Sequence, residues 1–156
     1  MEYIRSQKNN GCIFCQKSED SLDRDNLVLF RGKNSFVLMN LYPYNNAHLL
    51  IAPYEHVDTT FALASCVNSE IMGLANASMK IIKTTMNAEG FNFGANIGAI
   101  GGAGIKDHIH FHVVPRWLGD TNFMPVIGHT KVMVEGLLET YDELKPHFKK
   151  IKLIGD

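Results

Sequence analysis

The chain has 156 residues and a mass of 17.5 kDa, which is enough for one domain with a hydrophobic core and too little for two. Apolar residues make up 46% and charged residues 20% of the chain, which excludes a disordered or fibrous protein. Fifteen basic and sixteen acidic side chains leave a net charge of -1, so charge gives no support for binding nucleic acid or an anionic membrane surface.

The first half of the chain predicts short strands joined by tight turns. Residues 11–16 form a short knuckle and a polar loop follows. Apolar runs rich in β-formers then predict three strands, over residues 27–30, 35–41 and 48–52. Gly32 to Asn34 is the expected hairpin turn between the first two strands. A short helical turn is expected over 59–64.

The second half predicts one long helix and two further strands. Apolar residues recur at three-to-four spacing over 69–89, and Gly90 follows as a stop. Strands are expected over 91–97 and 108–114, the second of them ended by Pro115.

A last helix is expected over about 135–144, ended or kinked by Pro146. The order of strands, long helix, strands and helix predicts an α+β domain with a mostly antiparallel sheet. We expect a single domain over 11–147, with a polar extension before it at 1–10 and a tail after it at 148–156.

Three cysteines and the absence of targeting signals indicate a reduced, cytoplasmic protein. The first ten residues are polar and show no signal-peptide pattern, and no apolar stretch is long enough to span a membrane. Cys12 and Cys15 lie too close together to organise a secreted disulfide scaffold. Cys66, near an apolar helix face, is predicted to be a buried small hydrophobe.

The most informative segment is a run in which histidines alternate with large apolar residues. The histidines are His108, His110 and His112, separated by Ile109 and Phe111. Residues two apart in a strand share a face, so the imidazoles are expected on one side and the apolar residues in the core. Thr, Lys or Glu would solubilise a surface strand equally well, so the pattern indicates a chemical site.

Two chemistries suit such a face. Three histidines can ligate a catalytic zinc, but that site needs an open position and often a carboxylate base, and no Asp or Glu follows in the strand. A neutral imidazole can instead be a nucleophile, with its neighbours donating hydrogen bonds to an anion. The glycines just upstream favour the second chemistry, because backbone N–H groups can approach phosphate closely there: Gly98, Gly101, Gly102 and Gly104.

Residues 108–114 resemble the His-x-His-x-His-x-x signature of the histidine triad family of nucleotide hydrolases and transferases. The segment 40–53 is similar to the family's upstream segment. Residues 101–107 and 115–123 look most like the branch of diadenosine tetraphosphate phosphorylases and hydrolases. The resemblance covers most of the chain and implies the HIT-like fold, in which a five-stranded sheet is combined with one long helix and a C-terminal helix.

The resemblance implies cleavage of dinucleoside polyphosphates, such as diadenosine tetraphosphate or triphosphate, at the α-phosphate. His110 matches the nucleophile, which forms a nucleotidyl-histidine that phosphate or water then releases. His112 matches the residue that bonds the phosphate or leaving group, and His48 matches the upstream histidine that supports the orientation of the triad. The alternatives are an adenosine 5′-monophosphoramidase and a non-catalytic nucleotide-binding module on the same fold.

The resemblance also suggests where the nucleotide lies. Asn40 falls where the family holds the ribose hydroxyls, and Asn96 lies near its phosphate-contacting side chain. Phe14 and Leu38 are assigned to the adenine pocket, with core packing as the alternative for each. One departure is Ala47, which replaces the usual Gly before the upstream histidine; a strained backbone is expected there, with the histidine's role retained.

Arg116 and Trp117 follow the histidine segment directly. A phosphate-binding Arg and a base-stacking Trp would suit the distal half of a dinucleotide. Pairing of Arg116 with a surface acid, and packing of Trp117 at a subunit edge, are equally open.

Cys12-x-x-Cys15 is the spacing of half a structural zinc site, and no thioredoxin-like βαβ unit surrounds it. The resemblance implies that His56 and His108 complete the site. Four protein ligands would make this zinc structural. A divalent cation such as Mg²⁺ is expected to come bound to the substrate's polyphosphate.

The resemblance further implies a homodimer. Its interface would be the helix over 69–89 and the neighbouring edge strand, although core burial explains the amphipathic pattern of that helix equally well.

Overall fold

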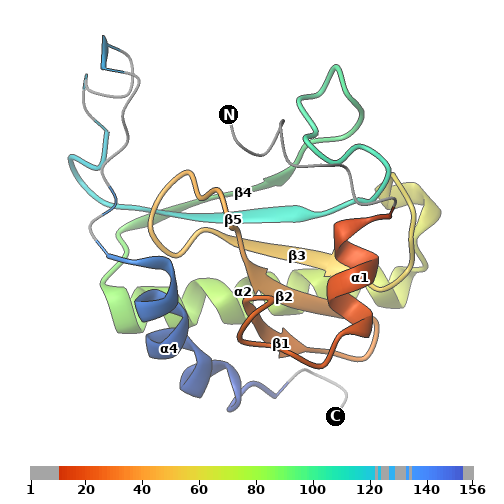
Figure 1. Cartoon of the computed structure of the whole chain (residues 1–156), viewed down its shortest axis with the longest axis horizontal. Coiled ribbons are helices and arrows are strands. Elements are labelled where there is room, and N and C mark those ends of the chain that lie inside the picture. Colours follow the sequence, from red (N-terminus) through yellow and green to blue (C-terminus); the bar gives the residue numbers. More distant parts are fainter. Residues whose placement is uncertain (1–10, 122, 124–126, 129–132, 134, 153–156) are drawn as a thin grey trace.

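The computed structural model describes residues 11–121, 123, 127–128, 133 and 135–152. Within these residues, five strands form one antiparallel sheet in the order β1-β2-β3-β5-β4 (Figure 1). The strands are β1 (Val28–Arg31), β2 (Ser35–Met39), β3 (Leu49–Pro53), β4 (Gly90–Ala95) and β5 (Phe111–Arg116). The predicted α+β class and the five-stranded antiparallel sheet are confirmed. The predicted extension at 1–10 lies outside the described residues.

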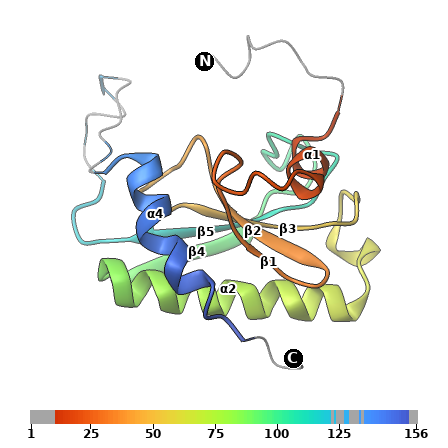
Figure 2. The ribbon, with the colours of Figure 1, turned by 60° about the horizontal axis from the view of Figure 1, so that its bottom comes forward.

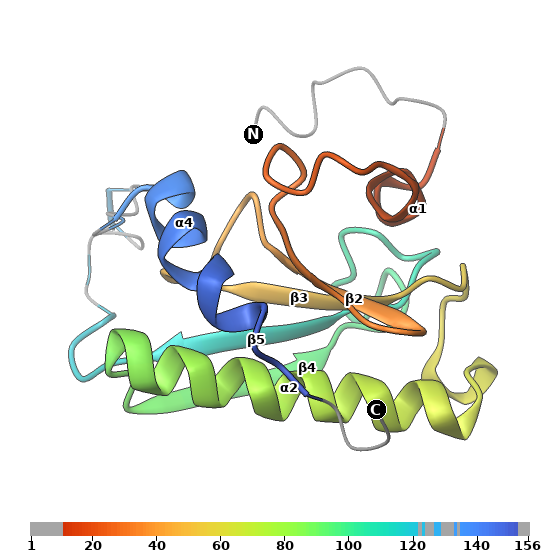
Figure 3. The same ribbon diagram turned by 90° about the horizontal axis from the view of Figure 1, so that it is seen from below.

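The helices cover the two faces of the sheet unequally. The long helix α2 (Ser65–Met86) runs along one face, and α4 (Leu137–Phe148) packs against both α2 and β1. The short helix α1 (Ile13–Glu19) lies on the other side of the sheet (Figures 2 and 3). No helix in the described part of the chain is long and apolar enough to cross a membrane.

Strand register separates two apolar clusters. Val37, Ile51 and Phe111 form a row across β2, β3 and β5 that faces α2 and belongs to the main core. Side chains alternate along a strand, so the next row, Leu38, Leu50 and His112, lies on the opposite face. Leu38 and Leu50 belong to the second cluster, together with Phe14 of α1. The long helix α2 therefore covers one face of the sheet. The opposite face, which carries His112, contacts α1 and borders a cavity.

The long helix differs from its prediction at both ends. It begins at Ser65, four residues early, and ends at Met86, where Asn87 adopts a left-handed conformation with φ 53°. An αL residue of this kind ends a helix without any need for Gly90. Cys66 is exposed, so its predicted burial is wrong: the buried face of α2 starts one residue later, at Val67. The helical turn expected over 59–64 is present as a 3-10 helix at Thr60–Ala62.

Pro115 does not end its strand as predicted, and of the two outcomes predicted for Pro146, the end of the helix is not observed. β5 starts at Phe111 instead of 108 and continues through Pro115, whose carbonyl accepts a hydrogen bond from the side chain of Asn45. Pro115 lies opposite Phe91 of β4, and the pairing of β3 with β5 already ends at Val113, so no residue of β3 lies opposite the proline. α4 continues through Pro146 because burial of Phe148 completes the core, while the carbonyl without a helical donor, four residues back, is on an exposed residue.

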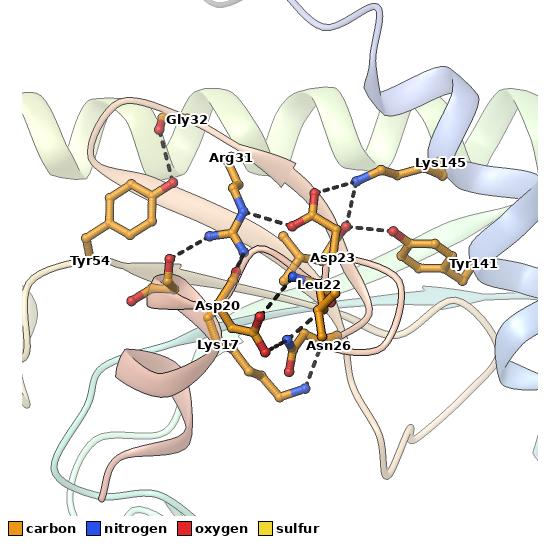
Figure 4. A network of polar contacts seen from close by, with 12 residues as sticks. Lys17, Asp20, Leu22, Asp23, Asn26, Arg31, Gly32, Tyr54, Tyr141 and Lys145 are labelled. Atoms are coloured by element: carbon orange, nitrogen blue, oxygen red, sulfur yellow. Dashed lines mark hydrogen bonds and ion pairs between the residues drawn. The ribbon is translucent and has the colours of Figure 1, made fainter.

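The helix α1 was missed from the sequence, and a polar network holds the loop that follows it (Figure 4). Arg31 of β1 donates to the carbonyl oxygens of three residues in this segment, namely Lys17, Ser18 and Asp20. It also pairs with Asp23 at 2.9 Å, and Lys145 of α4 reaches the same carboxylate at 3.0 Å. One guanidinium therefore fixes the end of α1 relative to β1 and α4.

We expect Arg31→Met to lower the free energy of unfolding by about 2 kcal/mol, because several partly buried acceptors lose their donor together. Urea denaturation would measure the change. The matched control is Arg24→Met, which removes an ion pair with Asp142 whose side chains are 54% and 55% exposed. Such an exposed pair adds little to stability, because water and salt screen its charges. Equal losses in the two variants would contradict the role given to Arg31.

Candidate functional site

A cavity of about 480 Å³ opens on the sheet face opposite α2. Leu38, Leu50 and His112 line it from the cross-strand row of β2, β3 and β5. Ile13, Phe14 and Lys17 line it from α1. The remaining lining residues come from loops and neighbouring positions: Met39, Asn40, Leu41, Tyr42, Tyr44, Asn96, Gly104, Ile105 and His110. The cavity therefore combines an apolar part near α1 with a polar part at the histidines.

Hydrogen bonding fixes the proton on His110. Its Nδ1 lies 2.9 Å from the carbonyl oxygen of His108, which can only accept, so Nδ1 carries the hydrogen. The Nε2 atom is therefore left with a free lone pair. The side chain is 5% exposed, and burial lowers its pKa below 6.5, which keeps the ring neutral at physiological pH. A neutral imidazole with a bare nitrogen is suited to nucleophilic attack.

A chain of two hydrogen bonds gives His112 the opposite arrangement. The backbone N–H of Tyr44 donates to Nδ1 of His48 at 2.9 Å, so the proton of His48 is on Nε2. That Nε2–H donates to Nδ1 of His112, also at 2.9 Å, which puts the proton of His112 on its own Nε2. This Nε2 is buried and has no hydrogen-bond partner among the described residues. His112 thus holds an unused N–H donor at the cavity.

Burial, with a smaller contribution from neighbouring His110, lowers the pKa of His112 to about 4. An unfolded histidine titrates near 6.5, so between these two values the unfolded chain binds a proton that the folded chain does not. The stability contributed by neutral His112 is therefore present above about pH 6.5 and is lost as the pH falls toward 4. We expect the melting temperature of the wild type to fall more steeply across this range than that of His112→Asn. Parallel curves in thermal unfolding by circular dichroism would contradict this.

The turn before β3 positions His48. Asn40 places its side-chain nitrogen 3.3 Å from Nδ1 of His48 and accepts from the backbone N–H of Tyr42. Ala47 has φ 52°, so the left-handed backbone expected there is present. A methyl group in that conformation costs about 1 kcal/mol, and the fully buried His48 still reaches His112 at 2.9 Å.

Of the loop glycines that the sequence placed at the phosphate site, only Gly104 lines the cavity in the structure. Gly98 and Gly102 have φ of 73° and 87°, a conformation that favours glycine. Gly104 lines the cavity beside Asn96, whereas Gly102 does not, and its carbonyl accepts from the Asn96 side chain at 3.5 Å. The loop therefore faces the cavity through Gly104 and the side chain of Asn96.

The four predicted metal ligands lie together. The donor atoms of Cys12, Cys15, His56 and His108 are all within 4.8 Å of one another. His108 Nδ1 lies 3.3 Å from Cys12 Sγ, 3.7 Å from Cys15 Sγ and 3.2 Å from His56 Nδ1. A tetrahedral zinc with its usual bond lengths separates two nitrogens by roughly 3.3 Å and nitrogen from sulfur by roughly 3.6 Å. The spacing and the donor set both fit a tetrahedral metal ion.

The protonation of His108 fits the same conclusion. Its Nε2 lies 2.9 Å from the carbonyl oxygen of Pro53, so the proton is on Nε2 and the bare Nδ1 faces the two thiols. Phe14, two residues after Cys12, packs its ring against His108 and His110, with centroids 5.1 and 4.8 Å apart. The metal group and the candidate nucleophile therefore share one aromatic neighbour.

Arg116 and Trp117 are not brought to this cavity. Arg116 binds both carboxylate oxygens of Asp120 at 2.7 Å and holds the pKa of that acid down at about 2. Trp117 donates from its ring to the carbonyl of Met86 at 3.1 Å and packs against the main core. The structure thus shows the acid pairing considered for Arg116 and places the Trp117 ring against this protein's own core.

Sequence reasoning missed several lining residues, among them Lys17, Tyr44 and Ile105. Tyr44 could have been suspected from its position in the turn before His48, and Ile105 from the Gly-rich loop. Lys17 carried no signal, because its place depends on how α1 docks.

Comparisons with known proteins agree with this geometry. The family model described as HIT domain matches residues 22–117. The AP-4-A phosphorylase of Mycobacterium tuberculosis is 40% identical over 118 residues, which cover 76% of this chain and 60% of that protein. The chain thus spans less than two thirds of the length of that relative. The adenosine 5′-monophosphoramidase of Candida albicans is 28% identical over 110 residues, covering 68% of this chain and 70% of that protein.

The fold has close structural counterparts. A Zn-bound histidine triad family protein from Mycobacterium smegmatis superimposes with a TM-score of 0.71 at 20% identity, covering 90% of this chain and 94% of that chain. The sheet order, the histidine segment and the family match lead to one conclusion: this chain belongs to the HIT domain family.

Proposed function

We propose that the protein is a nucleotide hydrolase or transferase that cleaves dinucleoside polyphosphates at the α-phosphate. The observation that carries the proposal is the complementary protonation of two histidines in one cavity. His110 offers a bare Nε2, and His112 offers an Nε2–H with no partner among the described residues. The 40% identity to an AP-4-A phosphorylase supports this substrate class.

The proposed reaction has two steps. His110 Nε2 attacks the α-phosphorus, so a P–N bond forms and the P–O bond to the remaining polyphosphate breaks. The Nε2–H of His112 donates a hydrogen bond to the leaving oxygen. This bond stabilises the negative charge that develops on that oxygen. Phosphate or water then attacks the nucleotidyl-histidine, which restores the imidazole. His48 is a positioning residue, because it acts only through Nδ1 of His112.

The cavity can hold the nucleotide that is transferred. Its apolar part, with Phe14 and Leu38, suits a base, and Asn40, which lines the cavity beside His48, would hold the ribose. Asn96 and Gly104 face the phosphates from the loop. No Asp or Glu is among the described residues that line the cavity, so a divalent cation such as Mg²⁺ would enter bound to the polyphosphate.

We further propose that Cys12, Cys15, His56 and His108 hold a structural zinc. The nitrogen and sulfur separations fit a closed tetrahedral site, and a Zn-bound protein of the same fold is known from Mycobacterium smegmatis. The ion would fix α1 against the histidine segment. Thiolate ligands need reducing conditions, so we propose the cytoplasm as the compartment.

We also propose a homodimer. β4 is an edge strand of the sheet, and its residues Asn92, Phe93 and Gly94 are exposed. On the neighbouring helix α2, Met72 is 49% exposed. An unpaired strand edge beside exposed apolar side chains suits pairing with a second copy, and light scattering measures the assembly.

The activity is tested by incubating the protein with diadenosine tetraphosphate, with and without phosphate, and identifying the products. ADP and ATP formed only with phosphate would establish a phosphorylase, and AMP and ATP formed without it would establish an asymmetric hydrolase. An adenosine phosphoramidate is assayed in parallel, because a relative is named as a monophosphoramidase. Turnover of the phosphoramidate alone would replace the proposal with that activity, and no turnover of either would leave a binding role.

A further inference from the structure

A second cavity, of about 250 Å³, lies farther along the same face of β5. Because side chains alternate, His112, Val114 and Arg116 follow one another on this face. The first of these lines the first cavity, and the other two line the second cavity. A strand rises about 3.3 Å per residue, so the second cavity lies roughly 13 to 20 Å from His110 along the strand.

Tyr44 belongs to both cavities. Its ring stacks on His112 at a centroid distance of 5.7 Å and an angle of 10°, while the residue is 60% exposed. One face of the ring is thus held by the imidazole, and much of the ring remains accessible. An aromatic ring held in this way is a platform on which a nucleic acid base can stack.

The charges of the second cavity favour a neutral and polar ligand. Arg116 is its cation and is paired with both oxygens of Asp120, which also accepts from the side chain of Asn45 at 2.8 Å. The remaining groups are neutral, including the side chains of Asn92 and Thr121. The carboxylate of Asp120 would repel a phosphate. A base and its ribose carry no charge and offer hydrogen-bond donors and acceptors.

We infer that the second cavity binds the second nucleoside of a dinucleoside polyphosphate, with Tyr44 as the ring on which its base stacks. The inference rests on the proposed function. It adds the place where the second nucleoside, which belongs to the leaving group, is bound. A chain of several phosphates reaches from His110 along the strand to this cavity. The single P–N bond of a phosphoramidate leaves nothing to occupy it, so the cavity distinguishes the two substrate classes.

The test compares diadenosine tetraphosphate with adenosine 5′-tetraphosphate, which has the same phosphate chain and lacks the second nucleoside. We expect the wild type to prefer the dinucleotide by about tenfold in kcat/KM, as base stacking on an aromatic ring provides. Tyr44→Ala is expected to bring this ratio close to one, and Tyr44→Phe, which keeps the ring, to preserve it. Thr121→Trp, which fills the second cavity from the exposed loop after β5, is expected to lower the ratio as Tyr44→Ala does.

Each contrary result has its own meaning. If Tyr44→Ala slows both substrates equally, the ring only supports His112 and the inference is overturned. A wild-type ratio of one, or an unchanged ratio in Thr121→Trp, also overturns it while the proposed function stands. Failure of the wild type to cleave either compound overturns the proposed function, and with it this inference.

Discussion

His110→Ala is expected to lower the turnover of diadenosine tetraphosphate by about 10⁴-fold or more, because the variant has no atom that can form the covalent intermediate. In the wild type the nucleophilic Nε2 is bare, since Nδ1 is committed to the carbonyl of His108. Product formation followed by chromatography measures the loss. A substrate labelled at the α-phosphate should also leave acid-labile label on the wild type and none on the variant.

The control for this experiment is His147→Ala, which changes an exposed histidine near the end of α4. It should retain full turnover and full labelling. A His110→Ala protein that keeps turnover within tenfold of the wild type would exclude a nucleotidyl-histidine at this position. Loss of label without loss of turnover would indicate direct attack by water or phosphate in the same cavity.

Cys15→Ser is expected to abolish stoichiometric zinc binding and to lower the free energy of unfolding by about 3 kcal/mol or more. One of four ligands is lost from a group whose donor atoms all lie within 4.8 Å of one another. The metal content of the purified protein and denaturant unfolding measure the two effects. Activity should fall as well, because Phe14 loses its fixed position against the ring of His110.

Cys66→Ser is the matched control, because Cys66 is exposed on α2 and is not part of the group. It should keep one zinc per chain and the wild-type stability. A zinc-free wild type that unfolds at the same denaturant concentration as the zinc-bound protein would show that the ion does not hold α1 in place.

The sheet could be predicted from the sequence because its signals are local. Most strands are short apolar runs bounded by Gly, Pro or Asn, and three of the four pairings join strands that follow one another in the chain. The pairing of β3 with β5, across α2 and β4, has no such local signal. The histidine segment and the metal ligands were also visible, since their residue types and spacing are unusual. That His108 and His110 would precede β5 was not visible: the backbone N–H of Ile109 bonds to Val57, outside the sheet ladder.

The remaining features depend on contacts between distant segments. The helix α1 is short and has no side-chain N-cap, so nothing local marks it, and Arg31 holds its end from another element. Tyr44 became informative only when its ring was found stacked on His112. The sequence left open whether Arg116 binds phosphate or pairs with an acid. Its partner is Asp120, four residues later, and no sequence periodicity connects the two residues.

The metal group joins segments that are far apart in the sequence and are therefore synthesised at different times. Cys12 meets His108 across 96 residues, so the metal group cannot close during synthesis until residue 108 has been made, although Arg31 of β1 can already hold the end of α1. A cross-link that closes a loop of about 100 residues removes on the order of 4 to 5 kcal/mol of chain entropy from the unfolded state. A bound ion would act in the same way, and much of its effect on stability would be independent of the packing around it. The metal group is then among the last contacts of α1 to form, and His110 gains Phe14 as its aromatic neighbour only after residues 108–110 have been made.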